Sequence, residues 1–518
     1  MKQLSEATYK NDFVAQFKGD TTGSAKPRQT PGVFYGLIKP TPVKEPLLLA
    51  WSDELAKELG LTRPTDSKEI DLLAGNTILP NMKSYAARYG GHQFGNWAGQ
   101  LGDGRAITLS ELITSQNKKF ELQLKGAGPT PYSRRADGRA VLRSSVREYL
   151  MSEAMYYLGV PTTRALSLVA TGDDVLRDMF YNGHPAYEPG AIVMRVAPTF
   201  LRFGNYEIFT ALGETENLKK LVNWTIEQHF PHIKGKNKVL QWFREVVIKT
   251  AALMVEWMRV GFVHGVMNTD NMSILGLTID YGPYSFVDDF DLNFTPNTTD
   301  LPGRRYAFGK QPSVAKWNLG CLAGALAPLF PDTKELVSVL EEYDEAFWMR
   351  YYRMMGDKTG IDDINEDDVT LLRNFEKTLN HTKADMTIFF QLLINLPMNA
   401  NEEKLIAHFN DSFYSELNEE QKTEFFTLLK DYIQRVNKNK ISAEERVALM
   451  KRTNPRFILR NYLLHQAIEE LTNGEDKLFA QLQQAMKEPY TNKWDQFFAK
   501  RPDWASRTAG CSMLSCSS

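Results

Sequence analysis

Four short apolar stretches in the first two hundred residues predict the strands of a small β-sheet. They are residues 106–112, 120–125, 165–170 and 190–196, with a turn predicted at 171–174. Residues 120–125 alternate apolar and polar side chains, as a strand with one buried face does. Between the second and third stretches, apolar residues recur at helical spacing and stop before Gly159 and Pro161, which predicts one helix against the sheet.

The chain after residue 217 is predicted to be mainly helical, because its apolar residues follow a helical period. The longest predicted helices are 218–230, 240–260 and 314–329, and amphipathic helices continue beyond residue 332. Prolines interrupt the first 85 residues around one short helix, 52–61, so this part is predicted to wrap around the rest. The sequence thus predicts an α+β protein with a small β-rich lobe and a larger helical lobe.

Composition and charge limit the kinds of ligand that the protein is expected to bind, and they leave the predicted α+β fold unchanged. The 518 residues are 43% hydrophobic and 24% charged, which is ordinary for a globular protein of about two to four packing units. Lysine and arginine (61) balance aspartate and glutamate (63), so bulk charge favours neither nucleic acid nor an anionic membrane. With three cysteines, no apolar span of about 20 residues and no leader-like start, we expect a cytoplasmic monomer.

A polar loop and the short apolar run after it carry the strongest chemical signal. His264 begins the loop, and Asn271 follows seven positions later. Asp280 then begins an Asp-x-Gly after the apolar residues 272–279. A loop with this spacing, a β-hairpin and a metal-binding Asp are the layout of a protein-kinase catalytic centre. Mg²⁺ takes one or two carboxylate or amide oxygens from a protein, and Asn271 and Asp280 offer that pair.

The catalytic carboxylate of a kinase is missing from its usual place. The position two after His264 is Val266, which cannot accept a proton. Either the site has lost its chemistry or the base lies elsewhere, and Asp270 beside Asn271 is the nearest replacement. An ordinary polar loop is the competing interpretation, because short motifs also match by chance.

A strand lysine and a helix glutamate strengthen the kinase interpretation. Lys125 and Glu148 predict the ion pair that positions ATP phosphates in kinases, although a surface lysine and a solvated helix face would give the same pattern. The predicted fold is therefore a protein-kinase-like bilobal one. Its parts are an N-terminal wrapping extension (1–85), a β-rich lobe (86–198), a helical lobe (199–430) and a helical C-terminal extension with a cysteine tail (431–518).

Glycines and arginines outside this loop fit an anionic ligand. Gly102, Gly104 and Arg105 end a glycine-dense stretch that can approach phosphate closely, or can simply form hairpin turns. Arg195 and Arg202 lie where a kinase has its interlobe hinge, which normally borders an apolar adenine pocket. Arginine suits bidentate recognition of phosphate instead, so the hinge is predicted to meet phosphate.

Four internal segments and the C-terminal tail resemble the selenoprotein O family, and the resemblance runs from end to end. They are residues 89–105, 124–134, 137–145 and 264–274, and the terminal Ser515-Cys516-Ser-Ser. The resemblance implies a pseudokinase fold that acts as a metal-dependent protein adenylyltransferase, moving AMP from ATP to Ser, Thr or Tyr hydroxyls. UMP transfer from UTP is also attributed to members. The family binds its nucleotide in reverse, with the α-phosphate at the metals and the terminal phosphates where a kinase holds adenine.

The same resemblance implies a role for each candidate residue. It implies that Asp270 is the general base and that Asn271 and Asp280 hold Mg²⁺ or Mn²⁺. It implies that Glu148 holds Lys125 against the phosphates. The implied nucleotide contacts are Gly102, Gly104, Arg105, Lys125, Asp137, Gly138, Arg195, Arg202 and Asp280.

The tail carries a second implied property, sensitivity to oxidation. In eukaryotic members a selenocysteine stands at the position of Cys516, although an incidental thiol is the competing interpretation here. We hypothesise a reversible disulfide between Cys516 and either Cys511 or Cys321, because residues 280–316 contain no cysteine.

Two other functions fit the same residues. An atypical kinase would transfer the γ-phosphate with Asp270 as its base. A non-catalytic scaffold would bind nucleotide while its helical part recruits partners. The expected partners are a nucleoside triphosphate and protein substrates, without nucleic acid or membrane.

Overall fold

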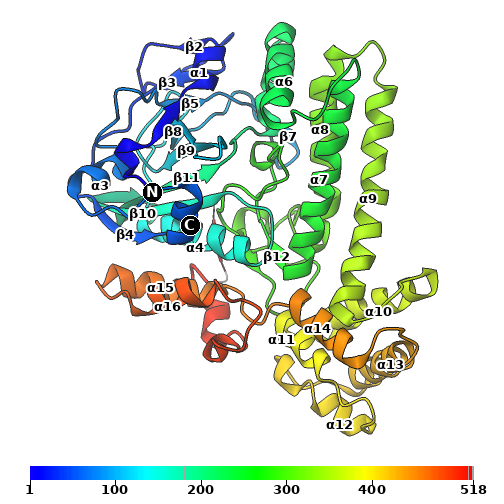
Figure 1. Ribbon diagram of the computed structural model, residues 1–518. Coiled ribbons are helices and arrows are strands. Elements are labelled where there is room, and N and C mark those ends of the chain that lie inside the picture. Colours follow the sequence, from blue (N-terminus) through cyan, green and yellow to red (C-terminus); the bar gives the residue numbers. More distant parts are fainter. Residues whose placement is uncertain (180–182, 512, 516–518) are drawn as a thin grey trace.

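The computed structural model describes residues 1–179, 183–511 and 513–515, in which a β-sheet packs beside a group of long helices (Figure 1). Its described strands follow the order β2-β3-β5-β8-β9-β11-β10-β4, with β1 paired to β8. The central strands are antiparallel neighbours: β8 (Ala106–Ile113), β9 (Lys119–Lys125), β11 (Ala186–Ala197) and β10 (Arg164–Arg177). The predicted α+β organisation, with a β-rich lobe and a larger helical lobe, is confirmed.

The side chains of strand β9 alternate between the apolar core and the opposite face of the sheet, which carries Lys125. Leu122 and Leu124 are fully buried in the same apolar core as α2 (Asp53–Leu59) and α3 (Ser67–Ala74). Lys125 points the other way, because successive side chains of a strand alternate between its faces. The burial of two leucines thus fixes the direction in which the lysine projects.

The first 85 residues belong to the sheet and are not a separate extension, which corrects the sequence prediction. They contribute helix α1 (Asp12–Gln16) and the strands β1 (Thr8–Lys10), β2 (Gly19–Asp20), β3 (Tyr35–Leu37), β4 (Leu47–Trp51) and the start of β5 (Tyr85–Ala87). β4 pairs with β10 at one edge, and β5 joins β8 to β3. The apolar run in β4 forms a strand because it covers the edge of β10, whose backbone groups would otherwise lack partners.

The turn predicted at residues 171–174 is wrong. β10 continues through these residues to Arg177, and its pairing with β11 shifts register between Ala170 and Asp174. Gly172 has φ +72°, a value that glycine adopts without steric cost, so extra residues bulge out of the ladder while the strand goes on.

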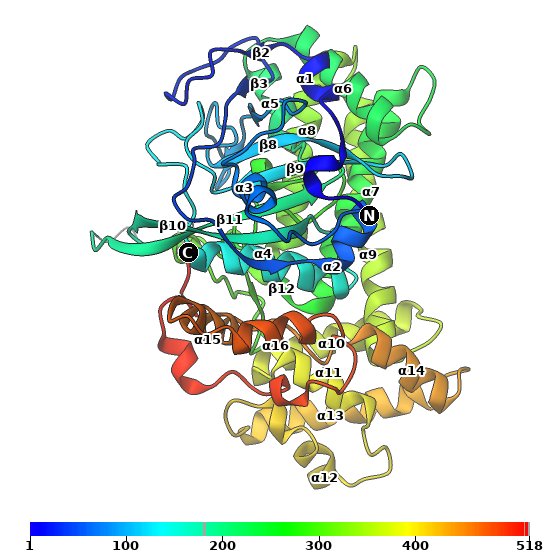
Figure 2. The ribbon, with the colours of Figure 1, turned by 60° about the vertical axis from the view of Figure 1, so that its left-hand side comes forward.

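Helix α4 (Leu142–Tyr157) packs against β10 and β11 and is also held by two later segments. Its Arg147 is 1% exposed and donates hydrogen bonds to Oδ1 of Asn461 at 3.2 Å and to the carbonyl oxygen of Tyr284 at 2.9 Å. Asn461 begins α15 (Asn461–Thr472), which lies beneath α4 (Figure 2). α4 therefore connects the sheet, the loop after residue 280 and the C-terminal helices.

The helical lobe is organised around α7 (Lys238–Val260), which packs against α8 (Gln311–Leu326) and α9 (Lys334–Thr359) (Figure 1). The remaining helices are α5 (Phe203–Ala211), α6 (Thr215–His229), α10 (Glu366–Thr382), α11 (Met386–Ile394), α12 (Glu402–Ala407), α13 (Glu419–Val436), α14 (Ala443–Thr453) and α16 (Lys477–Ala485). α13 continues through residue 430, so the boundary predicted there falls inside a helix, and the division into domains stays a prediction. No helix within the described ranges is long and apolar enough to cross a membrane.

Candidate functional site

A cleft of about 810 Å³ lies where the sheet faces the loop of residues 266–283. Its lining includes each residue predicted as base, metal ligand or nucleotide contact: Gly102, Gly104, Arg105, Lys125, Asp137, Gly138, Arg195, Arg202, Asp270, Asn271 and Asp280. Glu148 is 2% exposed and pairs with Lys125 from α4. The fold thus brings together side chains that the sequence spreads over almost two hundred positions.

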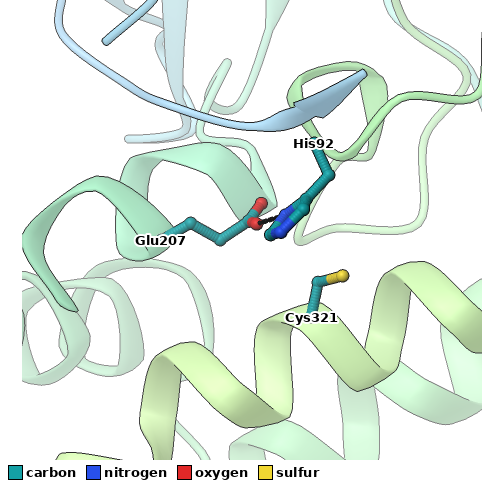
Figure 3. Close-up of side chains that lie close together, drawn as sticks. All are labelled: His92, Glu207 and Cys321. Atoms are coloured by element: carbon teal, nitrogen blue, oxygen red, sulfur yellow. Dashed lines mark hydrogen bonds and ion pairs between the residues drawn. The ribbon is translucent and has the colours of Figure 1, made fainter. Parts of the chain in front are cut away.

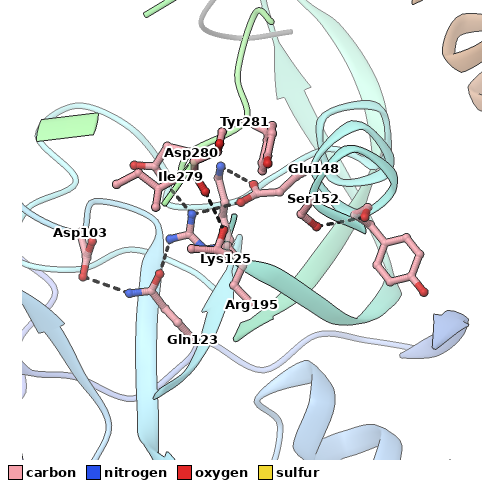
Figure 4. Close-up of polar contacts among 12 residues, drawn as sticks. Asp103, Gln123, Lys125, Glu148, Ser152, Arg195, Ile279, Asp280 and Tyr281 are labelled. Atoms are coloured by element: carbon pink, nitrogen blue, oxygen red, sulfur yellow. Dashed lines mark hydrogen bonds and ion pairs between the residues drawn. The ribbon is translucent and has the colours of Figure 1, made fainter. Parts of the chain in front are cut away.

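Three cations and two carboxylates interlock in the wall of this cleft. Figure 4 shows four of them: Lys125, Glu148, Arg195 and Asp280. Glu148 forms an ion pair with Nζ of Lys125 and lies 3.1 Å from Nη1 of Arg195. The same Nη1 lies 2.5 Å from Oδ1 of Asp280. Arg202 forms an ion pair with the other oxygen of Asp280. The two arginines, predicted as hinge residues, therefore project onto a metal-ligand candidate.

Burial and charge together set the protonation of this cluster. Burial alone would raise the pKa of Asp280, but the two arginines and Lys125 hold that pKa well below its usual range. Burial lowers the pKa of Lys125, and Glu148 opposes the change. Lys125, Arg195 and Arg202 present cationic groups at this wall, which suits an anionic ligand.

His264 is a structural residue that links the loop to Asp280. It is 1% exposed, and its Nε2 lies 2.8 Å from the carbonyl oxygen of Ile279. Its Nδ1 accepts a hydrogen bond from the backbone N–H of Val266 at 3.3 Å. Both contacts fit a neutral ring protonated at Nε2, and burial lowers the pKa of His264 accordingly.

The β-hairpin predicted for residues 272–279 is wrong for this fully described stretch. Ser273 bridges to Arg202, and Thr278 bridges to Thr162, so the two halves pair with other segments. Gly276, with φ +66°, turns the chain between the two halves, which pair with different segments instead of with each other.

Asp270 has the environment of a general base. It lies in the turn Thr269–Asn271, is 8% exposed, and its Oδ2 accepts a hydrogen bond from Gln93 of β6 (His92–Gln93) at 3.3 Å. Its Oδ1 has no hydrogen-bond partner among the described residues. Burial raises the pKa of Asp270 to about 6, although the charge of Arg202 opposes the rise. A carboxylate with a pKa near neutrality can accept a proton at physiological pH.

The oxygen atoms around Asp270 fit a hard divalent cation. The side-chain nitrogen of Asn271 donates to the carbonyl oxygen of Val266 at 2.8 Å, which leaves its amide oxygen to offer to a metal. Asp280 is ionised, and a carboxylate has enough lone pairs to accept from arginine and bind a cation at once. Amide and carboxylate oxygens are the ligands that Mg²⁺ prefers, so the residues fit the predicted Mg²⁺ or Mn²⁺.

Close packing against neighbouring residues is enough to explain why glycines occur at Gly102 and Gly138 in the cleft. A Cβ at Gly102, where φ is +140°, would lie 2.4 Å from the ring of Tyr132. A Cβ at Gly138 would lie 2.2 Å from the carbonyl of Gly128. These positions need glycine because the loop after β9 packs directly on them, whatever the cleft binds.

Comparison with known proteins decides the family. Residues 24–487 match the family model described as "Protein adenylyltransferase SelO". The chain belongs to the SelO family. Among its relatives, the protein nucleotidyltransferase YdiU of Cytophaga hutchinsonii is 56% identical over 100% of both chains. That of Nitrosospira multiformis is 50% identical over 100% of this chain and 98% of its own.

Among solved structures, the chain shows a weak similarity to ROP2 from Toxoplasma gondii. That protein is described as a virulence factor with a protein-kinase fold and no enzymatic activity. It is 14% identical and covers 67% of this chain and 87% of its own, with a TM-score of 0.22. A likeness this small carries no argument. The kinase-like features of the SelO chain rest instead on its strand lysine, helix glutamate and Asp280.

One predicted nucleotide contact of this SelO protein, Asp137, is already bonded to other residues of the chain. Asp137 forms a 2.7 Å ion pair with Arg177 at the end of β10 and accepts a hydrogen bond from the backbone N–H of Arg139. Burial would raise the pKa of Asp137, but its bonds to Arg177 keep that pKa below the ordinary value. Asp137 lies in the cleft lining, and its contact with nucleotide stays a prediction.

Sequence reasoning missed three polar residues of the SelO cleft. Asp103 is 3% exposed, lies 3.6 Å from Arg202 and accepts a hydrogen bond from Gln123 at 3.3 Å. Gln123 could have been found, because it lies two residues before Lys125 and shares its face of the strand. Gln93, which contacts Asp270, carries no signal in the sequence.

The predicted redox residues of the SelO tail are only partly described. Cys516 lies outside the described residues. Cys511 is 3% exposed, and burial raises the pKa of its thiol to about 12. The disulfide of Cys516 with Cys511 or Cys321 therefore stays a prediction.

Proposed function

We propose that this SelO-family chain moves AMP from ATP to Ser, Thr or Tyr hydroxyls of protein substrates and releases pyrophosphate, with UTP as a second donor. The observation that carries the proposal is the position of Asp270. A buried carboxylate with a raised pKa lies next to three cationic side chains in one cleft, so a base and a phosphate-binding wall share a site. Membership of a family of protein adenylyltransferases supports the choice of AMP as the transferred group.

The residues divide the work of an in-line displacement at the α-phosphorus. Lys125, Arg195 and Arg202 hold the phosphate oxygens and reduce the charge that builds up on the departing pyrophosphate. Asp270, which lines the cleft, accepts the proton of the attacking hydroxyl. A divalent cation held by Asn271 and Asp280 would add further charge neutralisation when bound.

The position of the label in ATP tests the reaction. The protein is incubated with Mg²⁺ or Mn²⁺, a heat-treated cell extract as acceptor, and ATP labelled on either the α- or the γ-phosphate. We expect α-label in protein and a mass increase of one AMP per modified site. Transfer of the γ-label instead would establish the atypical kinase, and binding without any covalent product would establish the scaffold.

Replacing Asp270 separates catalysis from binding. Asp270→Ala should slow transfer by about 10²- to 10⁴-fold, because the proton acceptor is lost. ATP affinity should change by less than about threefold, because the cationic wall is intact. Asp270→Asn is the matched control, since it keeps the size of the side chain and a contact with Gln93 but cannot act as a base. Wild-type transfer by either variant contradicts the role of Asp270.

A further inference from the structure

A second group of candidate ligands, His92, Glu207 and Cys321, comes together beside β6 (Figure 3). Gln93 and His92 are neighbours in this strand and so point in opposite directions. Gln93 contacts Asp270, whereas His92 meets Glu207 of α5 and Cys321 of α8. One ligand atom from each of these three residues lies within 4.8 Å of the others.

Glu207 is the residue that marks this cluster as more than a packing contact. Its side chain is 3% exposed, and its Oε2 lies 2.5 Å from Nδ1 of His92. Its Oε1 is buried and has no well-aligned hydrogen-bond partner among the described residues, although the Thr269 hydroxyl interacts closely enough with the carboxylate to lower its pKa against the rise that burial causes. A buried carboxylate oxygen without a partner costs free energy, and a cation would remove that cost.

The donor set selects the kind of cation. An imidazole nitrogen, a carboxylate oxygen and a thiolate sulfur are the ligands of Zn²⁺, whereas Mg²⁺ prefers oxygen alone. A neutral histidine, a carboxylate and a thiolate together carry two negative charges, which a divalent ion neutralises. We propose that His92, Glu207 and Cys321 form a Zn²⁺-binding site that is separate from the catalytic metal site.

Small side-chain movements bring the three ligands to a bound geometry. Zn²⁺ bonds of about 2.0–2.3 Å place tetrahedral ligands about 3.3–3.8 Å apart. The His92–Glu207 pair, now at 2.5 Å, must open slightly, and the sulfur must approach by about 1 Å. Burial raises the pKa of Cys321 to about 12, so the free thiol is protonated and binding releases its proton.

The surroundings leave one coordination position facing solvent. A groove of about 1010 Å³ runs past the three ligands and is lined by Trp97, Trp317 and Trp348. The ring of Trp317 packs edge-on against His92 with centroids 5.5 Å apart, which fixes the imidazole plane. Three protein ligands and one open position are typical of exchangeable zinc sites.

The ion would also brace the catalytic loop. The backbone N–H of His92 donates to Oγ1 of Thr269 at 2.7 Å, directly before Asp270. Zn²⁺ would tie β6 to α5 and α8, and so hold Gln93 in place against Asp270. His92, Glu207 and Cys321 act in this way as positioning residues.

Metal titration of the full chain tests the site. The reduced protein, stripped of metal by a chelator, is titrated with Zn²⁺ and with Co²⁺ in excess Mg²⁺, which occupies oxygen-only sites. We expect about one Zn²⁺ per chain and, with Co²⁺, a near-ultraviolet charge-transfer band that only thiolate ligation gives. Cys321→Ser should abolish the band and weaken Zn²⁺ binding at least about tenfold, and Glu207→Gln should also weaken it.

Cys511→Ser is the matched control, because it removes another cysteine but should leave the Co²⁺ band unchanged. Circular dichroism of each variant shows whether it folds. If Cys321→Ser does not fold, Glu207→Gln still tests the site, because it keeps the shape of the side chain. Failure to bind Zn²⁺ in excess Mg²⁺ overturns the proposal. A Co²⁺ band that survives Cys321→Ser overturns it as well.

Discussion

Asp270 shows how one residue acquires a property that its type does not have in water. The side chain is 8% exposed, and burial raises its pKa to about 6, against the opposing charge of Arg202. Gln93 donates to Oδ2 and thereby favours the charged form. The residue is therefore ionised near neutral pH and protonated in mild acid.

The pH dependence of transfer follows from this pKa. In the proposed reaction the ionised form is the base, so kcat/KM should rise as the pH increases through about 6 and level off above about 7. Gln93→Leu removes the hydrogen bond that lowers the pKa, so its rising limb should move to higher pH. Comparison with wild type under identical conditions cancels the titration of ATP itself. Coincident profiles for the two proteins would exclude Asp270 as the titrating group.

At the residue scale, sequence spacing predicted ligands but could not predict their neighbours. Asn271 was predicted as a ligand because its distance from His264 fits a known loop, and Asp280 because it begins an Asp-x-Gly, and both roles stay predictions. The contact of Gln93 with Asp270 joins positions 177 apart, and that of Arg202 with Asp280 joins positions 78 apart. Such contacts depend on how loops converge, which no local pattern encodes.

At the element scale, the pairing of β9 with α4 rests on a buried charge. Glu148 is 2% exposed and neutralises both Lys125 and Arg195. Removing this carboxylate leaves the buried Lys125 without its ion-pair partner, whereas Arg195 keeps its pair with Asp280. The glutamate therefore matters to the stability of the lobe as well as to the cleft.

Glu148→Ala should lower the free energy of unfolding by about 3–5 kcal/mol, as measured by urea denaturation. It should also weaken ATP binding, because Lys125 loses the partner that orients it. Glu188→Ala is the control: Glu188 pairs with Arg143 of the same helix at 2.9 Å but is 23% exposed, so its loss should cost less than about 1 kcal/mol. Equal losses in the two variants would contradict a special role for the buried pair.

Long elements were predictable and short ones were not. The helix predicted over 240–260 is α7, Lys238–Val260, because six turns of apolar spacing give a clear period. β4 has five residues and β5 has three, which are too few to show a period, so the N-terminal strands were missed. The bulge in β10 was read as a turn because glycine and aspartate are typical of both.

At the scale of the whole molecule, one buried arginine joins the C-terminal helices to the catalytic side. Arg460 precedes α15 and is 2% exposed. It forms ion pairs with Asp288, in the segment after Asp280, and with Asp385, at 2.9 Å. Asp385 also caps α11, so segments far apart in sequence meet at one guanidinium group.

Arg460→Ala should therefore destabilise the whole protein by about 3–5 kcal/mol, because it removes the guanidinium group that pairs with both the buried Asp385 and Asp288. Arg501→Ala is the matched control, since Arg501 also approaches Asp288, at 3.8 Å, but is 22% exposed. Its loss should cost less than about 1 kcal/mol. Thermal unfolding of the two variants measures the difference, and similar melting temperatures would show that the C-terminal helices are not anchored through Arg460.

The contacts of Arg147 bear on how such an enzyme can be switched. Protein kinases turn off by swinging the glutamate-bearing helix outward, which separates the lysine from the glutamate. In this chain the neighbour of Glu148 on that helix is fastened to Tyr284 on one side and to Asn461 on the other. An outward swing would break both buried bonds at once. The lysine and glutamate are thus held together in this structure, and moving α4 outward carries the cost of both bonds of Arg147.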